Sequence, residues 1–132
     1  MASKIQAINT YRPRIDQGNT VQKAEYIRIV ARATTLNEGT ADSVLKETRD
    51  VIIQFGREGR AVKIDGIGVF TPTIGLDGKL DISVRPDNAL IEGLNTPKTF
   101  SGTFINNENI GKTAEELVSM WNEAHPDDLV TA

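Results

Sequence analysis

Apolar residues recur every three or four positions in two consecutive segments of the chain, residues 22–34 and 40–56. This spacing places them on one face of an α-helix, so we predict a helix in each segment. The second segment has the wider apolar stripe, with charged residues on the opposite face. The connection between the two is short, and Asn37 or Thr40 is expected to cap the second helix.

Three strands are predicted after the second helix. Apolar and polar residues alternate in residues 62–65 and 80–85, a period of two that is typical of half-buried strands. Residues 69–74 are predicted to form the strand between them. Gly66-Ile67-Gly68 predicts a bend between the first two strands, because glycine adopts backbone angles that other residues avoid. Pro72 lacks an amide donor, so the second strand is expected at an edge or in an irregular position.

Weaker patterns flank this central region. Residues 5–11 alternate between apolar and polar positions, which predicts a short strand. After the third strand, a short helix is predicted at residues 88–95 and a further strand at residues 99–105. The segment Thr113-Ala114-Glu115-Glu116 matches a capping box, so a last helix is expected to begin there.

The chain offers little of the chemistry that enzymes use. It has no cysteine and one histidine, and it lacks the motifs of a nucleophile elbow or a phosphate-binding loop. His125 follows the last predicted helix and is expected to be an exposed histidine. We therefore predict no catalytic residue, no metal site, no cofactor and no small-molecule substrate, in a protein that is not an enzyme.

The net charge limits how this protein can bind nucleic acid. The 15 lysines and arginines are outnumbered by 18 acidic residues, which gives a net charge of −3. Because nucleic-acid-binding domains are usually basic, any DNA binding must come from a local patch. No apolar run approaches the length of a membrane span, and the first residues lead into no apolar signal region. We expect a cytoplasmic protein with no membrane partner.

The order of the central elements resembles the HU and integration host factor family of DNA-binding proteins. The segments that carry the resemblance are the turn Thr35–Asn37, the strand Arg60–Ile64, the segment Gly66–Phe70, the strand Ile82–Pro86 and the short helix Asn88–Leu94. Of these, Gly66-Ile67-Gly68-Val69-Phe70 resembles the family's Gly-Phe-Gly-Thr-Phe segment. The last two segments are similar to those of a divergent HU-like branch found in Bacteroides-type bacteria.

This resemblance implies an α+β fold in which a helix-turn-helix pair packs under a three-stranded antiparallel sheet. Residues 22–95 form the HU-like domain, with an N-terminal extension at residues 1–21 and a C-terminal extension at residues 96–132 that holds a strand and a terminal helix. The resemblance further implies a bacterial or phage protein, associated with the nucleoid and built as an intertwined homodimer.

In such a dimer, several apolar residues of the second helix and of the second strand lie in or near a common core. Packing within one chain and direct contact across the interface are equally compatible with the sequence. The residues concerned are Val44, Leu45, Val51, Ile52, Phe55, Val69 and Phe70.

The chain departs from the family pattern between the last two strands of the domain. Typical members extend this hairpin into a long basic arm, whose tip proline wedges between base steps of DNA. Here only Gly75-Leu76-Asp77-Gly78-Lys79 joins the strands, and it contains no proline. The Asp-Gly dipeptide favours an ordinary hairpin turn. We therefore expect no bending of DNA by intercalation.

The basic residues of the body are the remaining candidates for contacts to DNA. We expect them to touch backbone phosphates without reading sequence, as in an HU-like protein that binds duplex DNA non-specifically. Arg12 and Arg14, on either side of Pro13, form a separate small basic arm. The candidates are Arg57, Arg60, Lys63, Lys79, Arg85, Arg12 and Arg14.

A structural protein that reuses the HU fold for self-assembly or partner docking is the alternative. The missing arm, the acidic balance and the extra termini favour it. Strand-like segments near Ile5 and Phe100 would add to the sheet edge of a neighbour. Leu117, Met120 and Trp121 of the last helix would dock on a partner, although packing on their own domain is the favoured alternative.

Overall fold

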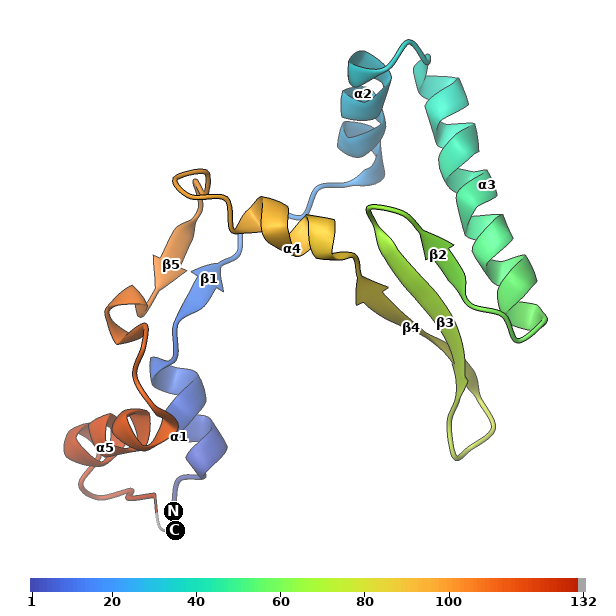
Figure 1. The fold of residues 1–132 in the computed structure, drawn as a ribbon. Coiled ribbons are helices and arrows are strands. Elements are labelled where there is room, and N and C mark those ends of the chain that lie inside the picture. The colour runs from blue at the N-terminus through green and yellow to red at the C-terminus, as the bar shows by residue number, and fades with distance from the viewer. Residues whose placement is uncertain (131–132) are drawn as a thin grey trace. The chain divides into compact units, whose positions relative to one another are not determined.

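The computed structural model describes residues 1–130 and divides the chain into two compact units (Figure 1). The central unit spans Thr20–Phe100, and the terminal unit combines Met1–Asn19 with the described residues from Ser101 onward. Residues 1–130 contain five α-helices and two antiparallel sheets, which confirms the mixed α/β class. The predicted domain boundaries after residues 21 and 95 stay predictions.

The central unit contains the helices and strands that the alternating pattern predicts. Asn37 rather than Thr40 caps the second helix, since its Oδ1 accepts a hydrogen bond from the Thr40 amide at 2.7 Å. The elements of the unit are α2 (Lys23–Ala33), α3 (Glu38–Arg57), β2 (Val62–Ile64), β3 (Gly68–Ile74), β4 (Leu80–Pro86) and α4 (Asn88–Leu94).

The sheet of the central unit has one entirely apolar face. Its strand order is β2-β3-β4, with Val62 opposite Phe70 and Phe70 opposite Val84. Opposite residues of neighbouring strands point to the same side, and successive residues alternate between sides. Helix α3 lies against β2 and β3. The apolar face consists of Val62, Ile64, Gly68, Phe70, Pro72, Ile74, Leu80, Ile82, Val84 and Pro86.

Pro72 lies in the middle strand of this sheet, although the sequence predicts an edge or irregular position. Strand β2 pairs only with Gly68–Phe70, so β3 has β4 as its sole neighbour beyond that point. Pro72 therefore lies opposite Ile82 in a stretch whose other side is open, where no ladder bond is lost.

An ion-pair cluster joins α2 to α3. The carboxylate of Asp42 lies 3.2 Å from the Nζ of Lys23 and 3.0 Å from the Nζ of Lys46. Hydrogen bonds from Lys46 and Lys23 lower the pKa of Asp42 below its ordinary value. The cluster therefore stabilises the helix pair only while the carboxylate is ionised.

The terminal unit corrects the prediction of a strand over residues 5–11, which form a helix instead. Ser3 caps this helix by accepting a hydrogen bond from the Gln6 amide at 3.0 Å. Ala7 is fully buried, whereas Ile5 is 71% exposed. The apolar residues that alternate in this segment therefore do not share one buried face, as they would in a half-buried strand. Because Ile5 lies in a helix, it offers no strand to the sheet of a neighbour. The elements are α1 (Lys4–Tyr11), β1 (Arg14–Asp16), β5 (Thr103–Ile105), the 3-10 helix η1 (Asn107–Asn109) and α5 (Ala114–Ala124).

Helix α5 packs against α1 and supplies the core of the terminal unit. Leu117 and Trp121 are buried, and the indole Nε1 of Trp121 donates to the carbonyl of Asp128 at 2.7 Å. The favoured alternative for these two residues, packing on their own domain, is confirmed, and docking on a partner is wrong for them. His125 is half-buried rather than exposed, because its ring stacks on Trp121 at a centroid distance of 3.8 Å.

Two asparagines tie the segment before α5 to the end of α1. The Nδ2 of Asn109, a buried residue, donates to the carbonyl of Tyr11 at 2.6 Å. The Nδ2 of Asn106 donates to the carbonyls of Thr10 and Arg12. These bonds satisfy backbone carbonyls where α1 ends, and they join residues nearly a hundred positions apart in sequence.

We predict that Gly68→Ala destabilises the central unit. A Cβ at this position would lie 2.5 Å from the carbonyl oxygen of Arg85, on the paired strand. The strands would have to separate, at a cost of about 1–3 kcal/mol. Urea unfolding at fixed protein concentration measures this. The control is Gly18→Ala, where no atom lies within 4 Å of the added carbon. Equal midpoints for both variants would contradict the close approach.

We also predict that Asp42→Asn weakens the central unit at neutral pH but not in acid. The folded state favours the ionised carboxylate, so its stabilising effect is present above the unfolded pKa. It disappears as the pH falls through the lowered folded pKa. Thermal unfolding from neutral pH down to about pH 3 should show the melting temperatures of the two proteins converging. Asp50→Asn, which removes only a pair with the adjacent Arg49, is the control and should show a smaller difference at neutral pH.

Candidate nucleic-acid interface

The polar face of the central sheet brings together two of the predicted DNA-contacting cations. Lys63 lies opposite Val69, and Val69 lies opposite Arg85, so the three form one row across the sheet. Neighbouring strands are about 4.8 Å apart, which separates the backbone positions of Lys63 and Arg85 by about 10 Å. Both side chains are exposed. The sequence contains the alternation that selects this face, but the register that aligns the two residues is visible only in the structure.

Short hydroxyl side chains continue the same face along β3 and β4. Thr71 lies opposite Ser83, and Thr73 lies opposite Asp81. Hydroxyls donate to phosphate oxygens as well as accept from water, so this row extends the polar surface beyond the cations. These hydroxyl residues are not among the candidates predicted from the sequence, because they carry no charge at the ends of their side chains that would mark them as phosphate contacts. Their position on the alternating face was the signal available in the sequence.

Two carboxylates limit the positive charge near the row. Asp65 lies in the turn after β2. Asp87 follows β4 and caps α4, accepting a hydrogen bond from the Ala89 amide at 2.9 Å. A shallow groove runs beside this cap and is lined by residues that include Val69, Arg85 and Asp87. A phosphate approaching Arg85 therefore meets the carboxylate of Asp87 nearby, which favours weak binding.

The remaining body cations lie elsewhere in the central unit. Arg57 lines a cavity with Pro72 and Ile82, which belong to the apolar face. The guanidinium of Arg60 lies 4.8 Å from the ring centroid of Phe55, a cation–π contact at the end of α3. Lys79 ends the hairpin turn, where the Gly75 amide donates to its carbonyl at 2.9 Å. The structure therefore does not gather the predicted cations into one patch.

Arg12 and Arg14 belong to the terminal unit. Arg12 follows α1 as its C-cap, and Arg14 begins β1, where it pairs with Ile105. Arg14 is thus part of a sheet and not of an extended arm. Among residues 1–130, none of the predicted DNA-contacting cations forms an ion pair.

Charge is divided unevenly between the two units. Residues 20–100 contain equal numbers of basic and acidic residues, so the whole net charge of −3 comes from the rest of the sequence. The central unit is therefore neutral, and its polar face gains positive character only from local placement of side chains.

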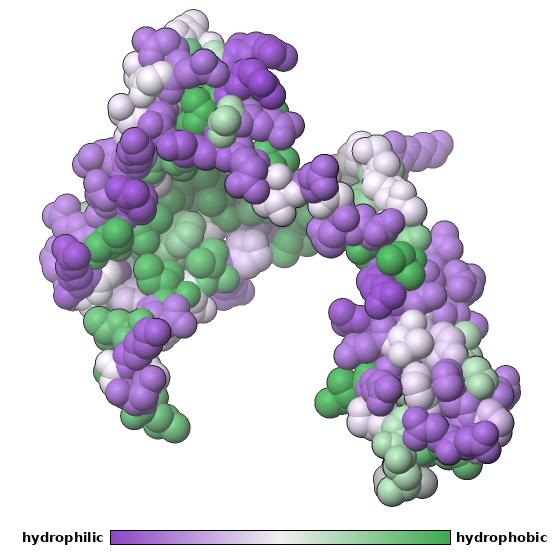
Figure 2. Space-filling view, turned by 180° about the vertical axis from the view of Figure 1, so that it is seen from behind, coloured by the Kyte–Doolittle hydropathy of each residue, from purple (hydrophilic) through white to green (hydrophobic). Residues whose placement is uncertain are grey.

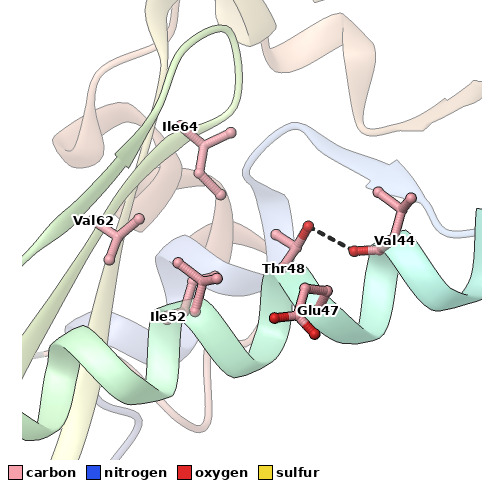
Figure 3. Close-up of a pocket in the computed structure, with 7 residues that line it drawn as sticks. Val44, Glu47, Thr48, Ile52, Val62 and Ile64 are labelled. Atoms are coloured by element: carbon pink, nitrogen blue, oxygen red, sulfur yellow. Dashed lines mark hydrogen bonds between the residues drawn. The ribbon is translucent and has the colours of Figure 1, made fainter.

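The apolar face of the sheet and the facing side of α3 are incompletely covered. Figure 2 shows hydrophobic side chains gathered in a hollow of the central unit. In Figure 3, Val62 and Ile64 project from β2 toward α3, which carries Val44 and Ile52 beside them. The cavity between them has a volume of about 370 Å³. A second cavity lies between the end of α3 and β3–β4.

Of the seven predicted core or interface residues, Val44, Val51 and Ile52 line the cavity beside α3, whereas Val69 lies on the polar face of the sheet. None of the seven is fully buried, Val44 is 54% exposed, and Leu45 is also exposed. The other five, half-buried in the single chain, are Val51, Ile52, Phe55, Val69 and Phe70. Each therefore stays a candidate for contact with a second chain.

Two other kinds of site, a membrane-spanning helix and a metal-binding cluster, are absent from residues 1–130. The helices there are too short or too polar to cross a lipid bilayer. No cluster of three or more histidine, cysteine, aspartate or glutamate side chains in that range is arranged to hold a metal ion.

Comparison with known proteins shows the family to which the chain belongs. Residues 3–85 match the HU-HIG family, described as an HU domain fused to wHTH, Ig, or glycine-rich motif. No curated protein matches the chain. The match begins at residue 3, so it takes in α1 and β1 together with α2, α3 and the central sheet. It establishes an HU-like DNA-binding architecture. The chain belongs to the HU-HIG family.

Proposed function

We propose that the protein binds duplex DNA non-specifically, as a homodimer of its central unit, through phosphate contacts from the polar face of the sheet. The observation that carries this proposal is the row formed by Lys63, Val69 and Arg85. Two exposed cations on one face, with backbone positions about 10 Å apart and hydroxyl groups beside them, suit a phosphate backbone. Neither cation is placed to distinguish one base from another.

The homodimer is supported by the poor burial within one copy. Of the side chains of residues 20–100, only Ile27 and Ala41 are buried hydrophobics. A unit of this size that stands alone normally buries well over half of the surface its unfolded chain exposes. We infer that a second copy covers the apolar face and α3, completing the arrangement in which the helix pair packs under the sheet.

Dimerisation also bears on the affinity for DNA. A single central unit is neutral overall, and its two aligned cations lie near Asp65 and Asp87. Two copies would present two such rows to one duplex. Because each phosphate contact releases counterions, doubling the contacts raises affinity and steepens its dependence on salt. We infer weak binding that weakens further as salt rises.

The short hairpin supports contacts without intercalation. The turn between β3 and β4 closes with a hydrogen bond between the amide of Gly75 and the carbonyl of Lys79, so no arm extends beyond it. The Oδ1 of Asp77 accepts a hydrogen bond from the Lys79 amide at 3.0 Å. The tip of the hairpin therefore carries one carboxylate beside the one lysine. We infer that the duplex is held on the sheet without the wedge that bends it, in a protein associated with the nucleoid.

We predict that Lys63→Gln and Arg85→Gln each weaken binding to duplex DNA by several-fold. In a dimer each substitution removes two phosphate contacts, so the slope of log affinity against log salt should fall by about 2. Fluorescence anisotropy with a labelled duplex at several salt concentrations measures both quantities. Arg49→Gln is the matched control, because it removes the same charge from α3 at a residue paired with Asp50. Failure of the unaltered protein to bind duplex at low salt would overturn the proposal, as would equal losses in the control.

We predict that Val44→Asp separates the dimer. In one copy Val44 is 54% exposed, so a carboxylate there costs little. In the dimer it would be buried without a partner, weakening association by about a hundredfold. Light scattering after size-exclusion chromatography measures the mass. Ile110→Asp, at a 64% exposed position in the terminal unit, is the control. A monomeric unaltered protein would contradict the dimer.

A further inference from the structure

Strand β1 of the terminal unit has an open edge. The sheet contains only β1 and β5, so one side of β1 pairs with no strand among residues 1–130. All three residues of β1 are exposed, and the side chain of Ile15 at its centre is 46% exposed. An open strand edge presents unpaired backbone donors and acceptors that another strand can satisfy.

The side chains along this edge have a self-complementary charge pattern. Arg14 and Asp16 lie at equal distances on either side of Ile15. We propose that β1 pairs antiparallel with β1 of a second copy, about a two-fold axis that passes between their Ile15 residues. In that register each Arg14 lies opposite an Asp16, and both cross-strand pairs are attractive.

The same register extends an apolar row across the joined sheets. Within one copy Ile15 lies opposite Phe104 of β5, whose side chain is 45% exposed. Bringing two copies together gives a four-stranded sheet in the order β5-β1-β1-β5. The two Ile15 side chains then become neighbours, flanked on each side by Phe104, and four apolar side chains lie in one line on one face.

The charges on the open edge of β1 favour pairing with β1 of a second copy over pairing with an unrelated strand. Charged residues and proline on an edge normally discourage pairing, and Pro13 limits the segment available here to three residues. A strand without matching charges would leave Arg14 and Asp16 unpaired beside it. The edge of β5 has no comparable pattern, since Thr103, Phe104 and Ile105 are uncharged. Opposite charges placed symmetrically about Ile15 favour the same sequence in the reverse direction.

A pairing of three residues from each strand is a small contact. Its strength therefore depends on the local concentration of the two terminal units. Any association between the central units would link two terminal units and raise their effective concentration. The proposed pairing rests on neither DNA binding nor that association, because its geometry involves only β1 and β5. It therefore goes beyond the proposed function and is tested separately.

A single cysteine reports the pairing directly, because the chain contains no cysteine of its own. Paired side chains across a two-fold axis have Cβ atoms about 4.5–5.5 Å apart, close to the distance that a disulfide spans. Ile15→Cys should therefore form a disulfide-linked dimer under mild oxidation of the full chain. The control is Ile110→Cys, at a more exposed position of the same unit, which should link more slowly. Non-reducing gel electrophoresis measures both rates.

Charge reversal in the Ile15→Cys background tests the register. Arg14→Asp or Asp16→Arg alone places like charges opposite each other at both pairs, and should slow linkage by about tenfold at low salt. The double change Arg14→Asp with Asp16→Arg restores attraction and should restore the rate. An equimolar mixture of the two single-change proteins, denatured and refolded together, should link one protein to the other. Residues 14 and 16 lie opposite the uncharged Ile105 and Thr103 of β5, so we expect the charge-reversed variants to keep the fold of the terminal unit.

The disulfide-linkage rates distinguish the proposed β1–β1 pairing from random contact. Fast linkage at residue 15, loss with each single reversal and recovery with the double reversal would establish the pairing. Equal rates at residues 15 and 110, or rates unaffected by reversing the charges, would overturn it. Thermal unfolding of each variant shows that a slow rate reflects lost attraction and not lost structure.

Discussion

The register between β3 and its two neighbours is the constraint on which the central unit depends. With Phe70 opposite both Val62 and Val84, the apolar side chains of the three strands, except that of Val69, fall on the side facing α3. A shift of one residue in either pairing would exchange the faces of one strand. It would place Lys63 or Arg85 against the helix and expose valines and isoleucines. Core packing and the polar row are therefore fixed by the same hydrogen bonds.

Gly68 contributes to this register from the start of β3. It is the residue that lets the strand approach the Arg85 carbonyl closely, as the missing space for a Cβ shows. Its neighbour Gly66 has a φ of +81°, a conformation that suits the turn between β2 and β3. The two glycines thus serve different needs. The sequence indicates a bend for both, but only the structure shows that Gly68 is required for space.

The sequence predicts the central unit more accurately than the terminal unit for a physical reason. Elements of the central unit contact their neighbours in sequence, and their long apolar alternation determines which face is buried. In residues 5–11 the alternation is short, and the capping pair Ser3 and Gln6 was the better indicator of helix. Hydrogen bonds between α1 and the segment around Asn109 involve residues far apart in sequence, so no local pattern reveals them.

Of the candidate site, the sequence identifies the residue types and the structure supplies their grouping. Lys63 and Arg85 are recognisable as basic residues in alternating strands, whereas their alignment in one row depends on the pairing of three strands. Arg57 and Arg60 resemble them in sequence, yet their contacts are with Pro72 and Phe55. Charge alone thus predicts more candidates than the geometry brings together.

The terminal unit is assembled from both ends of the described chain, and this has a consequence during synthesis. Helix α1 and strand β1 leave the ribosome before the central unit, but α5, β5 and the asparagines that hold them are made more than eighty residues later. The central unit, whose contacts are local, can form its helices and strands in the interval. Until translation passes Ile105, both edges of β1 remain uncovered, and until it passes Ala124, the side of α1 that carries Ala7 has no helix to pack against. A pause in translation between Thr103 and Ala124 would thus prolong the stage at which the nascent chain is most exposed to chaperones and proteases.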